Sequence, residues 1–286
     1  MVRAWRGLAP LLVLPLVAGT APAAPPELRT FGPNPSSLPS PRSGEGEKDR
    51  LCSPSPLRGG GQGEGSCARG LIVVAGGVGG VDPLGMWAKL VLPWVGVHHE
   101  VRDFVWTTGV GNLVRDVKDT RNLMVRADQL AGELLRYKDE HPDSPVYLVG
   151  HSGGTGLLLA TAARLPPDTL ERIILLSPAV SPGYDLRSAL RATRGEVVSF
   201  HSPLDRFWLD WGTTRYGTID RVYTAAAGVN GFVVPAGLDA EGEALYRRLV
   251  QIGWKPEMVF ELRGGFHVST IMPAFLMRHV APWLKP

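Results

Sequence analysis

The sequence predicts an α/β domain in which a mostly parallel sheet carries helices on both faces. Short apolar runs rich in β-branched residues, such as 71–75, are typical of buried parallel strands. Segments with helical spacing lie between these runs, and alternation of this kind favours parallel strands joined by crossover helices. Glycine-rich turns follow two of the runs directly. The segment from Gly70 to Pro286 has a length that suits one such domain.

The first half of this segment predicts three strands and three helices. The run at 71–75 is bounded by glycines, and a helix is expected at 84–92 before a second strand at 103–106. Apolar residues from 123 to 137 recur at helical spacing, and His141-Pro142 ends that helix. A strand at 146–149 precedes a helix of small residues at 156–165, which Pro166-Pro167 ends.

The second half continues the alternation. Apolar runs predict strands at 173–176, 197–200 and 258–262. Helices are expected at 186–193, 240–251 and 270–284, and Pro273 is tolerated in the last of them because it falls near the first turn. Ligands of such sheets bind at the carboxyl ends of the strands, so the residues that follow each strand are the candidates for a functional site.

Residues 1–23 are typical of a secretory signal peptide. Arg3 and Arg6 precede an apolar run at 8–17, and Ala21-Pro22-Ala23 suits cleavage before Ala24. The run is short for a membrane span, and an uncleaved membrane anchor is the alternative interpretation. We therefore expect an exported protein, secreted or periplasmic, or one anchored to a membrane by this segment.

Residues 24–69 are expected to form a disordered linker rich in Pro, Gly and Ser. Nine prolines and eight glycines lie between Pro22 and Gly65, and such a segment buries too little apolar surface to offset its ordering entropy. Cys52 and Cys67 are the two cysteines of the chain, and both lie here. Export would allow them to pair across a small loop, and nothing in their context indicates catalysis or a metal site.

The charge of the chain points to no nucleic-acid partner. The formal net charge is +3, and two of the positive charges belong to Arg3 and Arg6 in the predicted leader. What remains is nearly neutral and carries no basic stripe. No nucleic-acid partner is therefore expected, and no membrane span is expected beyond the N-terminal segment.

A nucleophile-elbow pattern follows the predicted strand at 146–149. Gly150-His151-Ser152-Gly153-Gly154 matches G-x-S-x-G, with a strand before it and a helix after it. Glycines are needed where a side chain would clash with the tight turn. The alternative is a glycine-rich turn that contains an incidental serine.

With this motif in this context, the segment 70–286 resembles the α/β-hydrolase superfamily, in particular its serine esterases and lipases. The resemblance implies a minimal cap over the sheet and a triad in the chain order nucleophile, acid, base. Ser152 would be the nucleophile. The acid would follow a later strand, and the base would lie in a loop after the last one. No metal or other cofactor is implied.

Asp205 and His267 occupy the expected positions of the acid and the base. Asp205 comes shortly after the predicted strand at 197–200, and a capping role in a turn is the alternative. His267 follows the predicted strand at 258–262 in a loop that contains Gly264 and Gly265. The competing acids and bases lie deeper in irregular chain, on a helix face or before the elbow: Asp210, Asp220, Asp239, His98, His99, His141 and His279.

The glycines after the first strand fall where the superfamily places one oxyanion-hole donor. Gly76-Gly77-Val78-Gly79-Gly80 would allow an amide of Gly77 or Val78 to approach an oxyanion, with Gly153 as the second donor. Ala75 stands where related esterases often carry histidine, so the choice between the two amides stays open. The loop lacks the Lys-Ser/Thr of a phosphate-binding loop.

The substrate is the least defined part of the sequence-based prediction. The aromatic segment 205–235 could form a lid or a pocket wall, or could simply cover the core. His151, Trp87, Trp208 and Trp211 are the candidate pocket residues. The resemblance implies cleavage of carboxylic esters, so the expected partner is a small-molecule or acyl-ester substrate. Peptidase, thioesterase and acyltransferase versions use the same residues, and a non-catalytic binding protein of this fold is an alternative of a different class.

Overall fold

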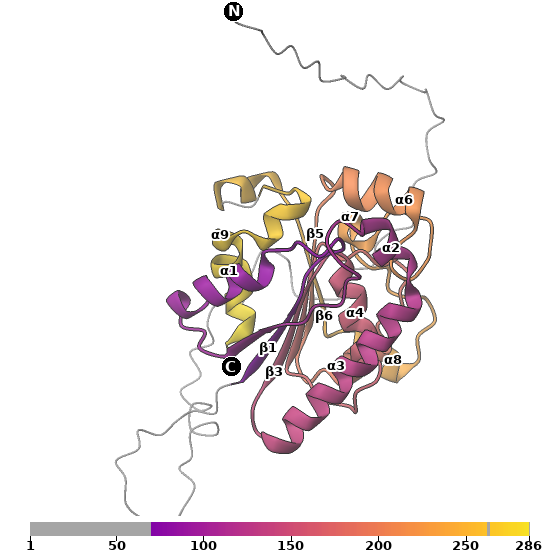
Figure 1. Ribbon diagram of the computed structural model, residues 1–286. Helices are drawn as coiled ribbons and strands as arrows, with labels where there is room; N and C mark the ends of the chain where they lie inside the picture. Colours follow the sequence, from indigo (N-terminus) through magenta and orange to yellow (C-terminus); the bar gives the residue numbers. More distant parts are fainter. Residues whose placement is uncertain (1–69, 262–263, 286) are drawn as a thin grey trace, which may run out of the picture.

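A parallel sheet of six strands runs through the part of the chain that the computed structural model describes, residues 70–261 and 264–285 (Figure 1). The predicted leader (1–23), the linker (24–69) and both cysteines lie outside the described residues. The strands lie in the order β2-β1-β3-β4-β5-β6. Their bounds are β1 Leu71–Ala75, β2 Glu100–Asp103, β3 Val146–His151, β4 Arg172–Leu176, β5 Val197–His201 and β6 Leu249–Gly253.

Helices cover both faces of this sheet, as expected for parallel strands joined by crossovers (Figure 1). Helix α1 and the C-terminal segments lie on one face, and α3, α4, α5 and α8 pack on the other. The bounds on the first face are α1 Leu84–Val91, η1 Pro93–Val95, α9 Pro273–Phe275, η5 Leu276–Val280 and η6 Ala281–Leu284. Those on the second are α2 Leu113–Lys118, α3 Thr120–Glu140, α4 Gly153–Ala162, α5 Arg187–Ala192 and α8 Ala240–Tyr246.

The remaining short helices lie near the carboxyl ends of the strands, at the top of the view in Figure 1. They are η2 Phe207–Gly212, α6 Thr213–Tyr216, α7 Ala227–Asn230, η3 Pro256–Glu261 and η4 His267–Ile271.

Side chains alternate between two cores along each central strand. In β1, Leu71 and Val73 join the core under α3 and α4, whereas Ile72 and Val74 join the core under α1 and the C-terminal segments. Leu148 and Tyr147 of β3 divide in the same way. All of these residues are buried. The continuous apolar runs of the sequence therefore correspond to strands that are covered on both faces.

The last strand is not where the sequence predicted it. The segment 258–262 was expected to be a strand, but Met258 lies in η3, a 3₁₀ helix. Strand β6 instead comes from the end of the predicted helix 240–251, because α8 ends at Tyr246 and residues 249–253 pair with β5. The Gln251 side chain bonds both the amide and the carbonyl of Phe232, which ties this edge strand to the chain beside it.

Two other elements also differ from their predicted form. The second strand is Glu100–Asp103 rather than 103–106, and Trp106 is buried beyond its end with its indole Nε1 donating to the Gly76 carbonyl at 2.9 Å. The predicted helix 270–284 is divided into short 3₁₀, α and π segments from η4 to η6. Pro273 and Pro282 lie within this stretch, and each removes an amide donor from a continuous helical ladder.

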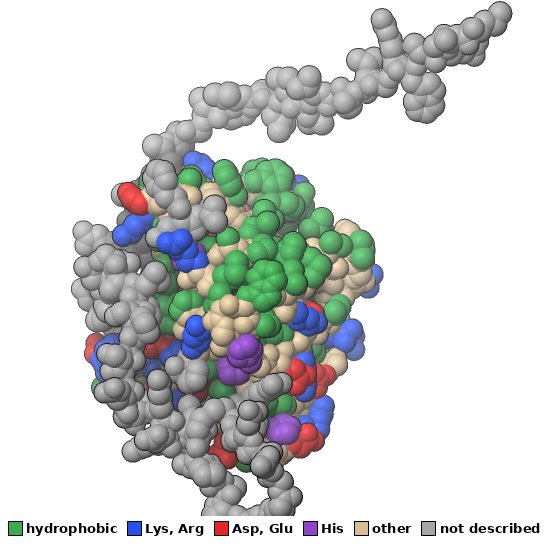
Figure 2. Space-filling model, turned by 90° about the vertical axis from the view of Figure 1, so that its left-hand side faces the viewer, with side chains coloured by type: hydrophobic (Ala, Val, Ile, Leu, Met, Phe, Trp, Pro, Cys, Tyr) green, Lys and Arg blue, Asp and Glu red, His purple; other side chains and the backbone are tan. Residues whose placement is uncertain are grey.

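Because all strands are parallel, their carboxyl ends meet at one edge of the sheet, and the residues that follow β1, β3 and β5 lie together there. On the face seen in Figure 2, exposed hydrophobic side chains gather towards this upper end. Gly70 lies at the opposite edge, where its amide donates to His99 Nδ1 at 2.9 Å and the next amide to the Pro145 carbonyl. Among the described residues, no helix is long and apolar enough to cross a membrane.

Candidate active site

Ser152 occupies a sharp turn between β3 and α4. Its backbone has φ of 50° and ψ of −122°, a conformation that non-glycine residues rarely adopt. The Ser152 amide donates to the Leu176 carbonyl at 2.9 Å, and the Ser152 carbonyl accepts from the amide and the hydroxyl of Thr155. The turn is therefore held from β4 and from the first turn of α4, as a nucleophile elbow requires.

The glycines on both sides of Ser152 are required by close packing. A Cβ at Gly154 would lie 2.2 Å from the Ala75 carbonyl oxygen and 2.5 Å from that of Gly76. A Cβ at Gly150 would lie 3.0 Å from the Cα of Thr155. Helix α4 thus starts in direct contact with the end of β1, which brings Ser152 next to the glycine loop that follows that strand.

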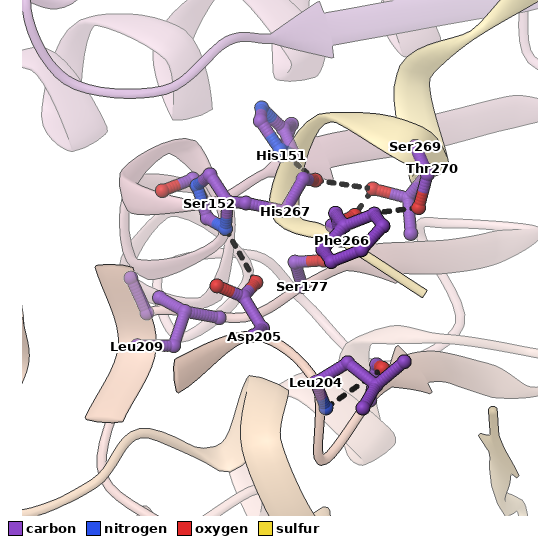
Figure 3. A network of polar contacts seen from close by, with 12 residues as sticks. His151, Ser152, Ser177, Leu204, Asp205, Leu209, Phe266, His267, Ser269 and Thr270 are labelled. Atoms are coloured by element: carbon purple, nitrogen blue, oxygen red, sulfur yellow. Dashed lines mark hydrogen bonds and ion pairs between the residues drawn. The ribbon is translucent and has the colours of Figure 1, made fainter. Parts of the chain in front are cut away.

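Asp205 lies four residues beyond β5 and is buried. Its amide donates to the Ser202 carbonyl at 3.1 Å, which closes a turn after the strand. Its carboxylate Oδ2 accepts a hydrogen bond of 2.6 Å from His267 Nδ1 (Figure 3). Asp205 Oδ1 is also buried and has no hydrogen-bond partner among the described residues, so the carboxylate is directed chiefly at His267.

The competing aspartates have other partners. Asp220 accepts from the amide and the hydroxyl of Ser181, and Asp239 caps α8 by accepting from the Gly242 amide. Asp210 lies 3.7 Å from Arg206 in a surface ion pair. Of the four candidates, the one that touches a histidine of this edge is Asp205.

His267 begins η4, and its ring is largely buried. Burial lowers the pKa of this imidazole, its hydrogen bond to Asp205 raises it, and the nearby His151 lowers it again; the net result is a pKa below the ordinary 6.5. In the neutral ring the Nδ1 proton goes to Asp205, which leaves Nε2 as a proton acceptor.

Ser152 and His267 lie in one cluster of polar side chains with Asp205 (Figure 3). The structure shows no hydrogen bond between the Ser152 hydroxyl and His267, whereas the bond between Asp205 and His267 is formed. Hydrogen bonds of this kind are often long before a substrate is bound. Ser152 itself is only 7% exposed.

The glycine loop after β1 contains the two amides that are candidate oxyanion donors, and one of them already donates to a side chain of the protein. The Gly77 amide donates to Asp82 Oδ2 at 2.6 Å, so it is not directed at a substrate. The side chain of the next residue, Val78, lies beside Gly153, because a Cβ at Gly153 would be 2.7 Å from Val78 Cγ1. Of the two candidate amides, that of Gly77 is therefore engaged with Asp82, and Val78 is the one whose side chain lies beside Gly153.

A second aspartate–histidine pair lies beside the first, and the sequence analysis did not predict it. His151 Nδ1 lies 2.6 Å from Asp82 Oδ2, and the rings of His151 and His267 are 4.8 Å apart. Burial raises the pKa of Asp82, but the hydrogen bond and charge of His151, with the amides of Gly77 and Leu84, lower it to about 2. An aspartate before Pro83 at the start of a helix resembles an ordinary cap, so the sequence carried little signal.

His151 is buried and belongs to this network. Trp87 belongs to α1 and packs against the core on that face of the sheet. Trp208 does approach the site, because its ring lies 5.9 Å from that of His267. Trp211 stacks on Phe207, which in turn packs edge-on against Trp208.

These three side chains, Phe207, Trp208 and Trp211, form an exposed group that we call the aromatic rim. They belong to η2, which starts two residues after Asp205. Their exposed fractions are 64%, 46% and 56%. Exposed aromatics that are grouped at the edge of a site are typical of a surface that binds an apolar group.

Over residues 70–261 and 264–285, no three His, Cys, Asp or Glu side chains are grouped so as to hold a metal ion.

Comparisons with known proteins yield structural matches only. No family model matches the chain, and no curated protein matches it. Among solved structures, the chain is similar to a predicted CIB-like hydrolase from Thermoplasma acidophilum, with 16% identity and a TM-score of 0.42, covering 76% of this chain and 86% of that one. It is also similar to Est1E from Butyrivibrio proteoclasticus, with 13% identity and a TM-score of 0.41 over 76% and 86% of the two chains.

A third structure of this kind is the RedJ thioesterase of prodiginine biosynthesis in Streptomyces coelicolor. It shares 15% identity with a TM-score of 0.38, over 80% of this chain and 91% of that one. The strand order, the parallel sheet with helices on both faces, and the elbow after β3 give the chain an α/β-hydrolase fold, as its sequence predicted.

Replacing Gly154 with alanine should destabilise the protein by about 3 kcal/mol or more, because the new Cβ would overlap backbone carbonyls that cannot move independently of β1. Chemical denaturation of the purified variant measures this change. Gly132→Ala is the matched control: Gly132 lies inside α3, where a Cβ has room, so stability should rise by up to about 1 kcal/mol. Equal stabilities of the two variants would contradict the packing described for the elbow.

Proposed function

We propose that this chain is a serine hydrolase that cleaves carboxylic esters of a small or acyl substrate through an acyl-enzyme on Ser152. The observation that carries the proposal is the 2.6 Å hydrogen bond from His267 Nδ1 to the buried Asp205, at the same sheet edge as the strained Ser152. A serine hydroxyl is a weak nucleophile until a neighbouring base takes its proton. The pair supplies such a base, with its tautomer fixed.

The proposed reaction has two halves. In the first, Ser152 Oγ bonds to the carbonyl carbon while its proton passes to His267 Nε2. The carbonyl oxygen becomes an oxyanion held by the amides of Val78 and Gly153, each worth about 3 kcal/mol to the transition state. The C–O bond to the alcohol then breaks, and Nε2 returns the proton to the leaving oxygen. In the second half, water attacks the acyl-enzyme in the same way and releases the acid.

The aromatic rim supports a preference for substrates with an apolar alcohol portion. His267 must reach the leaving oxygen to protonate it, and Trp208 lies against the same ring. The alcohol portion of the ester would therefore lie next to Trp208. Covering exposed aromatic surface with an apolar group is favourable by about 25 cal/mol per Å² of apolar area removed from water.

Ser152→Ala should abolish ester turnover, and Asp205→Asn should lower kcat by about 10⁴-fold because the imidazole loses its correct tautomer. Hydrolysis of p-nitrophenyl esters measures both, with circular dichroism to confirm folding. Asp210→Asn is the matched control and should retain activity, since Asp210 pairs with Arg206 at the surface.

A fluorophosphonate should label Ser152 of the wild-type protein. No adduct at Ser152 would favour a non-catalytic binding protein.

The acid limb of the pH profile should lie below pH 6.5. His267 accepts a proton only when it is neutral, so activity falls as the pH falls through its pKa, and that pKa is lowered chiefly by burial. The dependence of kcat/KM on pH measures this value for the free enzyme. A midpoint above pH 6.5 would show that His267 is not the titrating base or is not in its buried position.

Trp208→Ala should lower the preference for a bulky alcohol about tenfold, a free-energy difference of about 1.4 kcal/mol. Hydrolysis of benzyl acetate and of ethyl acetate is measured through the acid that each releases, and the ratio of the two kcat/KM values gives the preference. Trp94→Ala is the control, because Trp94 is an exposed tryptophan of η1 outside the rim. An unchanged ratio in Trp208→Ala would place the alcohol portion elsewhere.

A further inference from the structure

The Asp82–His151 pair joins three separate loops of the candidate site. Asp82 Oδ2 accepts from the Gly77 amide at 2.6 Å and from His151 Nδ1 at 2.6 Å. The other ring nitrogen, His151 Nε2, lies 3.2 Å from the backbone carbonyl of His267. One unbroken chain of hydrogen bonds therefore runs from the glycine loop after β1, through the residue that precedes Ser152, to the loop that carries the base.

The glycine loop is shaped around this carboxylate. A Cβ at Gly76 would lie 2.5 Å from the Cβ of Asp82, and a Cβ at Gly77 would lie 3.2 Å from Asp82 Oδ2 and 3.3 Å from the Cβ of Ser152. The two glycines thus let the Asp82 side chain approach the loop backbone. Its second oxygen, Oδ1, accepts from the Leu84 amide at 2.9 Å, which fixes the carboxylate to the start of α1.

The hydrogen bonds define the charge of His151. A carbonyl oxygen only accepts, so Nε2 must carry a proton to bond to the His267 carbonyl. The Asp82 carboxylate also accepts from the amides of Gly77 and Leu84, as an ionised carboxylate does, so the proton of its bond to His151 lies on Nδ1. With both nitrogens protonated, His151 is an imidazolium. Its side chain and that of Asp82 are 4% and 9% exposed, so the two form a buried ion pair.

We propose that Asp82 and His151 are positioning residues for this site: a buried carboxylate–imidazolium pair that fixes the oxyanion loop and the base loop relative to Ser152. The inference rests on the proposed function. Because Asp82 holds the Gly77 amide, the next amide, that of Val78, is left for the oxyanion. Because His151 holds the His267 carbonyl, the position of the base depends on the residue adjacent to the nucleophile.

The positive ring of His151 also acts on the base through space. Its centroid is 4.8 Å from that of His267, where a positive charge disfavours protonation of His267. The charged or titratable groups that act on His267 are His151, Asp205 and Asp82. Those that act on His151 are Asp82 and His267. Removing the charge on His151 should therefore make His267 easier to protonate.

The test uses Asp82→Asn, His151→Gln and the double variant in the full-length protein, with pH profiles of ester hydrolysis. We expect kcat to fall at least tenfold in each single variant with KM changed less than threefold, because the positioned groups act mainly in the transition state. In His151→Gln the acid limb of kcat/KM should move to higher pH. The double variant should lose little more than the worse single one, since the pair acts as a unit.

The matched control is His98→Gln, which removes an exposed histidine outside the network and should leave kcat and the acid limb unchanged. His151→Ala should be worse than His151→Gln, because glutamine retains an N–H donor for the His267 carbonyl. Wild-type kcat in Asp82→Asn and His151→Gln, with an unmoved acid limb, would overturn the proposal.

A second measurement keeps the proposal separate from the proposed function. Nitrogen-15 NMR of the histidine rings, assigned with His151→Gln, should show both nitrogens of His151 protonated at pH 7. A neutral His151 ring would overturn the ion pair even in an active enzyme. If His151 is an imidazolium but Ser152 forms no fluorophosphonate adduct, the result supports the ion pair and contradicts the proposed esterase activity.

Discussion

The contact between the start of α4 and the end of β1 is the constraint on which the rest of the site depends. Gly154 lies so close to the carbonyls of Ala75 and Gly76 that no other residue fits, and this contact fixes the elbow against the glycine loop. Ser152 takes up the resulting strain with its left-handed backbone. Strain of this kind persists only where surrounding structure over-determines it, and here hydrogen bonds from β4 and α4 supply that support.

Two aspartate–histidine hydrogen bonds, each 2.6 Å long, lie side by side but differ in what the second ring nitrogen meets. Asp205 holds a histidine whose second nitrogen is left as an acceptor, whereas Asp82 holds a histidine whose second nitrogen donates to a carbonyl. The partner of Nε2 makes the difference. In our proposal the ring at position 267 is neutral and acts as the base, and the ring at position 151 is charged and links the two loops.

The sequence predicted the central part of the fold because strands such as β1, β3 and β4 are buried on both faces and read as continuous apolar runs. It missed β6, whose mixed residues at the sheet edge continue a helical pattern, and it mistook the apolar 3₁₀ segment η3 for a strand. The error did not displace His267 from its expected place, because this residue follows β6 as well as the segment that was mistaken for a strand.

The elbow and Asp205 were predicted from the strands that precede them, β3 and β5, and His267 from its place after both in the chain order. Asp82 and its link to His151 could not be predicted, since the bond between them spans 69 positions and depends on how α1 meets the glycine loop. The aromatic character of η2 was visible in the sequence. The exposure of these aromatic side chains beside His267 could not be predicted, because it depends on side-chain packing.

The place of Gly70 has a practical consequence for handling the protein. Strand β1 begins at the amino edge of the sheet, where the Gly70 amide donates to His99 and the Leu71 amide donates to the Pro145 carbonyl, and Ser152 lies at the opposite edge. A solid support or a fusion partner joined directly to Gly70 would therefore attach at the sheet edge opposite the aromatic rim.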